Sequence, residues 1–379
     1  MKIWKVSAIY FFVITVFFCL VDEKIANAAT TSTTALKHQL QKILDKSLED
    51  TDGTGVVCLI KTPSFQWGGS SGFADYSKKR PMKTTDMLRL ASMTKTFVSV
   101  VVQKLAEEGK LNLDDKIKKH LPHKVTTRIP YGSKITIRQL LNMTSGIKSY
   151  TENDVYNDTV ESNPYRSAWT PEEIVRYIYN KKAVFPPGKG WDYSNTNYIL
   201  LDMIVKKAAG TLLATEMRRV IHAPLKLNNT FMEIQEKRSE GFNGLTVRGY
   251  DENGKDVTEI QDGFGLGDGG LISDANGVAK FFQALFIDRI ILSPVSLKQM
   301  KNFSLKGNYG LGLERVETTF GDAWGHSGSS FGFSGEMLYL PGRKIIFVIL
   351  TNDENDSNIS DIVFIKSIKL LLTCPKSFL

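Results

Sequence analysis

The sequence predicts an α/β (α+β) fold in which both ends of the chain build one antiparallel sheet, terminal helices flank the sheet, and an all-helical lobe is inserted. Two observations support this prediction. Apolar runs of strand length occur near the beginning and the end of the chain, and apolar residues at helical spacing dominate between them. We expect a sheet lobe at about residues 36–90 and 291–379, and a helical lobe at about 91–290.

The first residues have the features of an export signal. Two lysines precede an apolar run at residues 6–21, and the small-x-small pattern Ala-Asn-Ala follows at 26–28. The run has about 16 residues, fewer than the roughly 20 of a membrane span. We therefore predict a cleaved signal peptide at 1–28, a mature domain at 29–379, and an exported protein, periplasmic or secreted; an uncleaved anchor is the alternative.

A helix and two strands are predicted after the leader. The apolar residues of the helix recur every three to four positions. They are Leu36, Leu40, Ile43, Leu44 and Leu48. The strands are "GTGVVCLIKT" at 53–62 and "SFQWGGSSGFADY" at 64–76, with Pro63 in the turn between them.

Helical patterns dominate the middle of the chain. One helix opens near Ser92 and ends at Gly109, and a Thr-Pro-Glu-Glu sequence from Thr170 is typical of a helix start. Further helical patterns occur at residues 136–146, 170–180, 195–210, 212–225 and 273–286.

The last part of the chain returns to strands. Three runs at hairpin spacing, 322–330, 331–341 and 344–352, are separated by turns marked by glycine and by Pro341-Gly342. A final helical segment is expected at about 357–372.

Charge and cysteine content limit the partners. The net charge is +8, but Lys and Arg are scattered and not gathered with aromatic residues, which argues against nucleic-acid binding. The basic surface either contacts anionic envelope polymers or is simply solvated. We expect a monomer. Cys58 and Cys374 remain after export. The sequence does not decide whether they form a disulfide, although Cys58 lies in an apolar run typical of a buried side chain.

A serine and a lysine stand three residues apart where the first helix of the helical lobe begins, in "LASMTKTFVSVVV" at 90–102. A helix N-terminus favours acidic side chains, so Lys95 is electrostatically misplaced there. A plain N-cap role for Ser92 is one interpretation. The other interpretation is that the serine and the lysine are a catalytic pair. Residues three apart are neighbours on a helix, so Lys95 can reach the Ser92 hydroxyl, and a buried lysine with a lowered pKa can take its proton.

Two further motifs accompany this pair. "WDYSNTNY" places Tyr193-Ser194-Asn195 at the start of a helix, and "WGHSGSS" places His326-Ser327-Gly328 on a strand of the terminal sheet. Together the three motifs resemble the active-site triplet of the penicillin-recognising serine enzymes: S-x-x-K, Y-x-N and K/H-[ST]-G. The chain departs from the class A pattern of S-D-N and K-T-G. It is similar to class C β-lactamases and serine D-alanyl-D-alanine carboxypeptidases from about residue 38 to 352, which implies a β-lactamase/transpeptidase-like fold.

The resemblance implies three catalytic residues. Ser92 would be the nucleophile that the substrate acylates, and Lys95 would draw its proton. Tyr193 would protonate the leaving amine and help water attack during deacylation. Whether Lys95 or Tyr193 is the general base is left open.

The resemblance also implies substrate-binding residues. Asn195 would hydrogen-bond the acyl amide and hold the catalytic lysine. The backbone N–H groups of the nucleophile and of Ser329 would form the oxyanion hole. His326 and Ser327 would face the substrate carboxylate, and Gly328 would let the substrate approach the strand.

No cofactor or metal is expected, because the remaining histidines lack ligand spacing. The segment "GFGLGDGG" at 263–270 is only superficially similar to a dinucleotide-binding loop, since no parallel strand precedes it. We interpret it as glycine-rich backbone near the rim of the site.

The motifs predict a serine hydrolase that acts through an acyl-enzyme. A His in the first position of the third motif resembles certain secreted carboxypeptidases and favours a D-alanyl-D-alanine carboxypeptidase that acts on peptidoglycan stem peptides. A class C-like β-lactamase, an esterase and a D-amino-acid amidase are alternatives within the family. A non-catalytic envelope-binding protein is the alternative from another class.

Overall fold

The structure is a computed structural model of the chain. It describes residues 33–236, 241, 244–263, 265–304, 306–354 and 357–374. The predicted signal peptide at 1–28 lies outside these residues. Within them, no helix combines the length and the apolar character that a membrane span needs.

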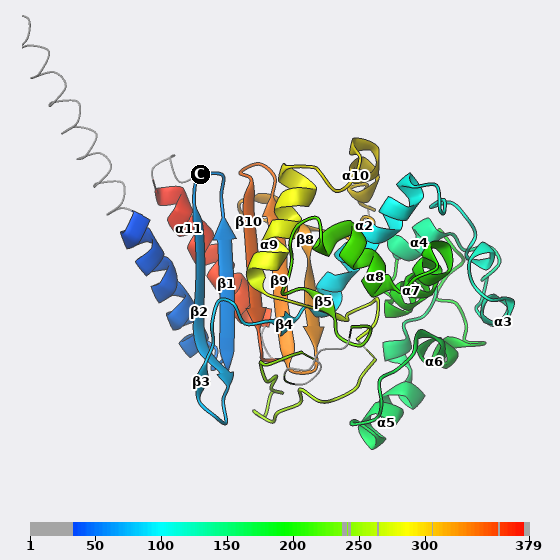
Figure 1. Ribbon diagram of the computed structural model, residues 1–379, viewed down its shortest axis with the longest axis horizontal. Coiled ribbons are helices and arrows are strands. Elements are labelled where there is room, and N and C mark those ends of the chain that lie inside the picture. The colour runs from blue at the N-terminus through cyan, green and yellow to red at the C-terminus, as the bar shows by residue number, and fades with distance from the viewer. Residues whose placement is uncertain are drawn as a thin grey trace, which may run out of the picture.

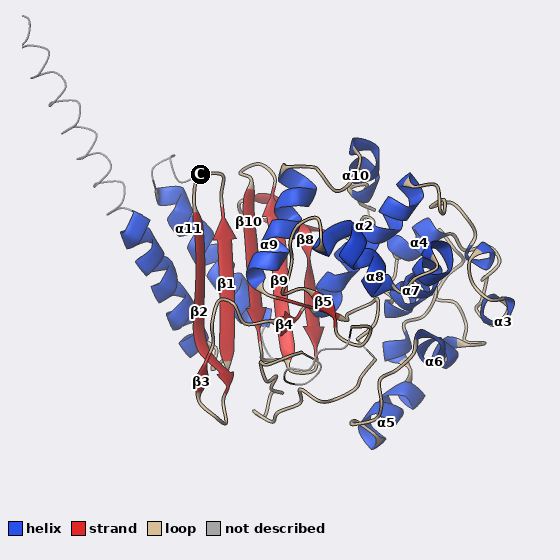
Figure 2. Ribbon diagram, in the orientation of Figure 1, coloured by secondary structure: helices blue, strands red, loops and turns tan. Residues whose placement is uncertain are grey.

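Seven antiparallel strands form the main sheet, in the order β3-β2-β1-β10-β9-β8-β7 (Figures 1 and 2). Their bounds are β1 Gly55–Lys61, β2 Gln66–Asp75, β3 Arg80–Pro81, β7 Glu314–Thr318, β8 Gly321–Ser330, β9 Phe333–Leu340 and β10 Ile345–Thr351. The central pair is β1 with β10, in a register that runs from Val56 opposite Thr351 to Lys61 opposite Ile346. The prediction that both ends of the chain build one sheet is confirmed.

Both faces of the sheet are covered, which explains why β1 is apolar throughout. Alternate side chains of a strand point to opposite faces. Val56, Cys58 and Ile60 face a core formed with the N-terminal helix (residues 33–50) and with α11 (Ser357–Thr373). Val57 and Leu59 face the larger core on the other side, which continues into the helical lobe. Figure 1 shows the two terminal helices side by side along the sheet. Cys58 is buried there, and Cys58 and Cys374 are both free thiols.

A second, small sheet and one helix lie between the main sheet and the helical lobe. The small sheet has the order β4-β6-β5, with β4 at Leu88–Arg89, β5 at Phe231–Met232 and β6 at Leu271–Ser273. The range 91–290 predicted for the helical lobe includes α9 (Ala275–Phe282), but this helix lies against β1 and β10 of the main sheet. Its phenylalanines and Val278 are buried there, so α9 belongs to the sheet layer.

Short helices make up the lobe beyond β8 (Figure 2). In chain order the helical segments are η1 Ala91–Met93, α2 Thr94–Glu107, η2 Ile117–Lys119, α3 His123–Thr126, α4 Ile137–Leu141, η3 Tyr150–Glu152, α5 Asp154–Ser162, α6 Pro171–Val175, η4 Arg176–Ile178, α7 Asn195–Ala209, α8 Leu213–Met217, η5 Arg218–His222, η6 Gln283–Ile287 and α10 Pro294–Met300. The central helices α2 and α7 are in contact with each other, and η1 is in contact with β8. The boundary between sheet and lobe therefore runs past the start of α2.

Candidate active site

Ser92 and Lys95 are in direct contact, as predicted. Ser92 lies in the 3-10 turn η1, and Lys95 lies in the first turn of α2. The Nζ atom of Lys95 is 2.8 Å from the Ser92 hydroxyl, and the Lys95 side chain is completely buried. Neither η1 nor α2 has a side-chain cap hydrogen bond. The N-cap interpretation of Ser92 is therefore wrong, and its hydroxyl is engaged by the lysine.

Strand β8 approaches the nucleophile closely at a glycine. A Cβ atom added to Gly328 would lie 2.4 Å from the carbonyl oxygen of Leu90 and 3.1 Å from the backbone nitrogen of Ser92. A side chain does not fit at that separation, so this position requires glycine. The turn is also strained, because Ala91 has a φ of +45°, a value that L-residues rarely adopt. The amide of Ser92 thus lies next to the strand that carries Ser329, as an oxyanion hole requires.

Tyr193 lies on the other side of the lysine, just before α7. Its ring centroid is 5.1 Å from Lys95 Nζ and 6.2 Å from the ring centroid of His326. Burial raises the pKa of the Tyr193 phenol well above its ordinary value, although a hydrogen bond with the Ser92 side chain opposes that rise. The phenol is therefore protonated at neutral pH and can donate a proton.

Asn195 is close to the site but does not hold the lysine. Its amide nitrogen donates to Thr151 Oγ1 at 3.3 Å, and its carbonyl oxygen is buried with no hydrogen-bond partner among the described residues. Lys95 Nζ instead donates to the backbone oxygen of Asp268 at 2.6 Å. The expectation that Asn195 holds Lys95 is therefore not met. The side-chain carbonyl oxygen of Asn195 is instead available to accept a hydrogen bond from a substrate amide.

Asp268 is a residue of the site that the motif analysis missed. Its side chain is buried, and Tyr150 donates a hydrogen bond to Oδ2 at 2.7 Å. Burial raises the pKa of the Asp268 carboxyl, and the charge of Lys95 opposes that rise. Burial lowers the pKa of Lys95, while the charges of Asp268 and Glu314 oppose the fall. Asp268 belongs to the glycine-rich segment 263–270, which was predicted to lie near the site. An acidic residue within a glycine-rich segment is the sequence feature that could have indicated it.

The histidine of β8 does not have the position expected of a carboxylate anchor. His326 is buried, its Nδ1 lies 2.6 Å from the carbonyl oxygen of Ser327, and its Nε2 lies 2.9 Å from the hydroxyl of Tyr309. Burial lowers the pKa of His326. A neutral, enclosed imidazole is not a cationic contact for a substrate. The exposed side chains of this segment are those of Ser327 and Ser329.

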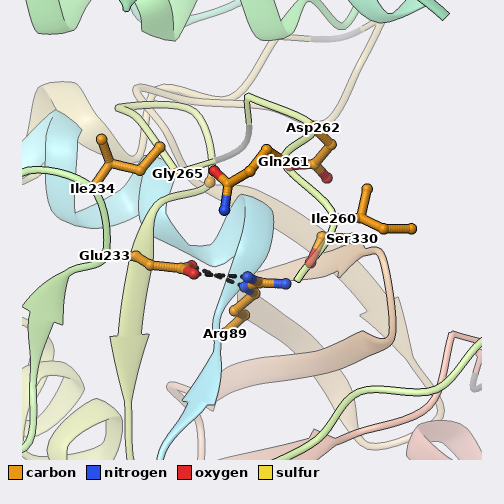
Figure 3. Close-up of a pocket in the computed structure, with 9 residues that line it drawn as sticks. Arg89, Glu233, Ile234, Ile260, Gln261, Asp262, Gly265 and Ser330 are labelled. Carbon is orange, nitrogen blue, oxygen red and sulfur yellow. Dashed lines mark hydrogen bonds and ion pairs between the residues drawn. The ribbon is translucent and has the colours of Figure 1, made fainter. Parts of the chain in front are cut away.

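A small pocket adjoins the site and contains a buried ion pair (Figure 3). Arg89 on β4 donates two hydrogen bonds, of 2.8 and 2.7 Å, to the carboxylate of Glu233 after β5. The pocket is lined by Arg89, Glu233, Ile234, Ile260, Gln261, Asp262, Gly265, Gly269 and Ser330. Figure 3 shows Ser330 beside the guanidinium. Because β4 leads into η1, the pair ties the segment before the nucleophile to the segment that follows β5.

The described residues contain no cluster of three or more His, Cys, Asp or Glu side chains that could hold a metal ion.

The fold and this Ser–Lys–Tyr arrangement define a class, the serine hydrolases with a β-lactamase/transpeptidase-like fold. The β-lactamase family matches residues 40–368 of the chain. The chain belongs to this family.

The chain is similar to proteins with different names and activities. Penicillin-binding protein 4* of Bacillus subtilis (strain 168) is 30% identical over 345 residues, which are 85% of this chain and 72% of that protein. A D-stereospecific amidohydrolase from Streptomyces sp. is 28% identical, with a TM-score of 0.75 over 86% of this chain and 97% of that chain. The D-amino acid amidase from Ochrobactrum anthropi SV3 is 26% identical in its complex with L-phenylalanine, with a TM-score of 0.76 over 88% and 98%.

Proposed function

We propose that the chain is an exported serine hydrolase that cleaves peptide or amide bonds of D-amino-acyl compounds through an acyl-enzyme on Ser92. The observation that carries the proposal is the 2.8 Å contact between the Ser92 hydroxyl and a completely buried lysine. The similarity to proteins described as a penicillin-binding protein and as D-amino acid amidases supports the D-configured acyl group. Export rests on the leader pattern at 1–28.

The pKa directions support Lys95 over Tyr193 as the general base. Burial favours the neutral amine of Lys95 and the neutral phenol of Tyr193. We assign Lys95 as the base that accepts the proton of Ser92, whose oxygen then attacks the substrate carbonyl carbon. The N–H groups of Ser92 and Ser329 would stabilise the oxyanion. Tyr193 would donate a proton to the leaving amine and recover one from Lys95, so that no proton is gained or lost in acylation.

Deacylation repeats these steps with water as the nucleophile. Water would attack the ester carbonyl, the oxyanion would form in the same place, and the proton of water would return to Ser92 as the acid product leaves. Tyr193 and Lys95 are the groups close enough to Ser92 to relay that proton.

The D-alanyl-D-alanine carboxypeptidase predicted from the sequence is one member of this class, with stem peptides as substrates. A D-amino-acid amidase is the second candidate, because the sequence-based preference depended on His326 as a cation, and burial lowers the pKa of this imidazole. A β-lactamase or an esterase would use the same residues.

The proposal is tested by trapping the acyl-enzyme. The purified protein is mixed with the p-nitrophenyl ester of an N-acetyl-D-amino acid, quenched in acid and measured as intact mass. We expect a mass increase equal to one acyl group, located by digestion on the peptide that contains Ser92, and a much smaller increase with the L-enantiomer. No adduct, or an adduct on another residue, would contradict the proposed function.

We expect Asp268→Asn to shift the acidic limb of the kcat/KM profile to lower pH. The carboxylate of Asp268 stabilises the ammonium form of Lys95. Its removal lowers the pKa of Lys95 further, so the neutral amine is available at lower pH. The profile is measured with an uncharged ester.

Asp202→Asn is the matched control for this prediction, because Asp202 is also buried but is not among the groups that shift the pKa of Lys95. An unchanged acidic limb in Asp268→Asn, in a variant that unfolds at the same temperature as the wild type, would remove the electrostatic role assigned to Asp268.

A further inference from the structure

The outer edge of β8 is open beside the nucleophile. Strand β7 pairs with β8 only from Glu314 opposite Gly325 to Thr318 opposite Gly321. From His326 onward, no described strand pairs with that edge of β8. Gly328, within the open part, is the residue in contact with the Ser92 segment. An extended peptide can bind such an edge as an additional strand, and here it would pass the reacting serine.

A carboxylate stands where this open edge begins. Glu314 is the first residue of β7, and its Oε2 atom accepts a hydrogen bond from the backbone N–H of Ser327 at 3.2 Å. Its Oε1 atom is 3.4 Å from Nδ1 of His326. The side chain of Glu314 is 26% exposed, so its charge is in contact with solvent, and this charge also acts on Lys95 and Tyr193.

The neighbouring imidazole does not neutralise this carboxylate. A carbonyl oxygen only accepts hydrogen bonds, so the contact of Nδ1 with the Ser327 oxygen places the proton on Nδ1. The Nε2 atom then accepts from the hydroxyl of Tyr309. A neutral imidazole satisfies both contacts, and burial lowers the pKa of His326, which favours this form.

No arginine or lysine among the described residues forms an ion pair with Glu314. The adjacent Arg315 pairs with Glu317 and Asp322 instead. The open edge therefore begins with a carboxylate at the Ser327 amide, which forms no arginine or lysine ion pair among the described residues and interacts with the charge of Lys95 only at longer range.

We infer that Glu314 is a specificity-determining residue that selects acyl donors whose leaving group carries no carboxylate. This inference rests on the proposed function and narrows its substrate class. A carboxylate brought to the Ser327 amide would compete with Glu314 for the N–H and meet a like charge. A primary amide, an ester or an amine-bearing group meets neither obstacle, and a cation would be attracted.

The consequence concerns the carboxypeptidase activity predicted from the sequence. A D-alanyl-D-alanine peptide ends in a free carboxylate, and the family resemblance places that group at His326 and Ser327. The charge of Glu314 disfavours it there. The inference therefore favours hydrolysis of carboxylate-free amides and esters over carboxypeptidase activity.

Two substrates that differ only in this charge test the inference: N-acetyl-D-alanyl-D-alanine, with its free carboxylate, and N-acetyl-D-alanyl-D-alaninamide, in which the carboxylate is capped. The bond followed is the D-alanyl–D-alanine bond in both, so the release of D-alanine or of D-alaninamide is measured and the release of ammonia from the capped substrate is recorded separately. We expect wild-type kcat/KM to favour the amide by at least about tenfold, the ratio that corresponds to 1.4 kcal/mol. Glu314→Gln retains an acceptor for the Ser327 amide and should reduce this preference by about the same factor; Glu314→Lys should reverse it.

Glu317→Gln is the matched control, because Glu317 lies on the same strand, its side chain is 70% exposed, and it is paired with Asp322, away from the open part of β8. It should leave the preference unchanged. Equal preference in the wild type and in Glu314→Gln, with both enzymes active, would overturn the inference alone. No turnover of either substrate and no acyl-enzyme on Ser92 would overturn the proposed function and the inference with it.

Discussion

Ser92→Ala is expected to abolish acyl-enzyme formation and to reduce turnover by roughly four or more orders of magnitude, the effect of losing a nucleophile. Only the hydroxyl oxygen is lost, and Ser92 is partly exposed in η1, just before α2, so the fold should persist. The measurement is intact mass after reaction with an activated D-aminoacyl ester and with a penicillin. The circular dichroism spectrum of the variant should match that of the wild type.

Ser64→Ala is the control for that experiment, because Ser64 is exposed and lies in the turn between β1 and β2. It should react like the wild type. A full adduct on folded Ser92→Ala protein would show that another residue is the nucleophile. Absence of any adduct on the wild type would favour the non-catalytic envelope-binding alternative.

Removing the proton-transfer pair should be strongly non-additive. Lys95→Met and Tyr193→Phe each remove a group that interacts with the Ser92 hydroxyl. We expect each to reduce kcat by about 10²- to 10⁴-fold, the usual contribution of a positioned acid or base. The double variant should be little worse than the poorer single variant, because residues that act on one proton path are lost as a unit.

The design of this cycle depends on burial. Methionine fills the space of Lys95 but leaves the buried carboxyl of Asp268 without its cation, a change that usually costs stability. Thermal unfolding checks that both single variants remain folded at the assay temperature. If the two losses multiply, Lys95 and Tyr193 act on independent steps, and the assignment of one shared path is wrong.

The strongly apolar parts of the fold were predictable from the sequence. Strands β1, β9 and β10 are buried on both faces, and their apolar runs indicated them directly. Strand β7 was missed because its sequence, Glu-Arg-Val-Glu-Thr, lies at the sheet edge and shows no apolar alternation. The strands of the small sheet have two or three residues each, too few for a periodic signal.

The candidate site was predictable where chemistry depends on local spacing. The contact between Ser92 and Lys95 follows from helix geometry, since they are three residues apart. Asp268 and Glu314 come from other parts of the chain, and only the tertiary fold brings them to the lysine and to β8. The same is true of Tyr309, whose hydroxyl enclosed the histidine that was expected to face the substrate.

The pairing of β1 with β10 also has a consequence for biosynthesis. The middle of the sheet joins Val56 to Thr351, so the hairpin of β1 and β2 emerges from the ribosome long before its partner exists. Non-local pairing of this kind makes folding slow and leaves a strand edge open to aggregation in the interval. The sheet therefore cannot be completed until β10 has been synthesised. A nascent chain that stops before residue 345 already contains the nucleophile but lacks the strand that completes the centre of the sheet.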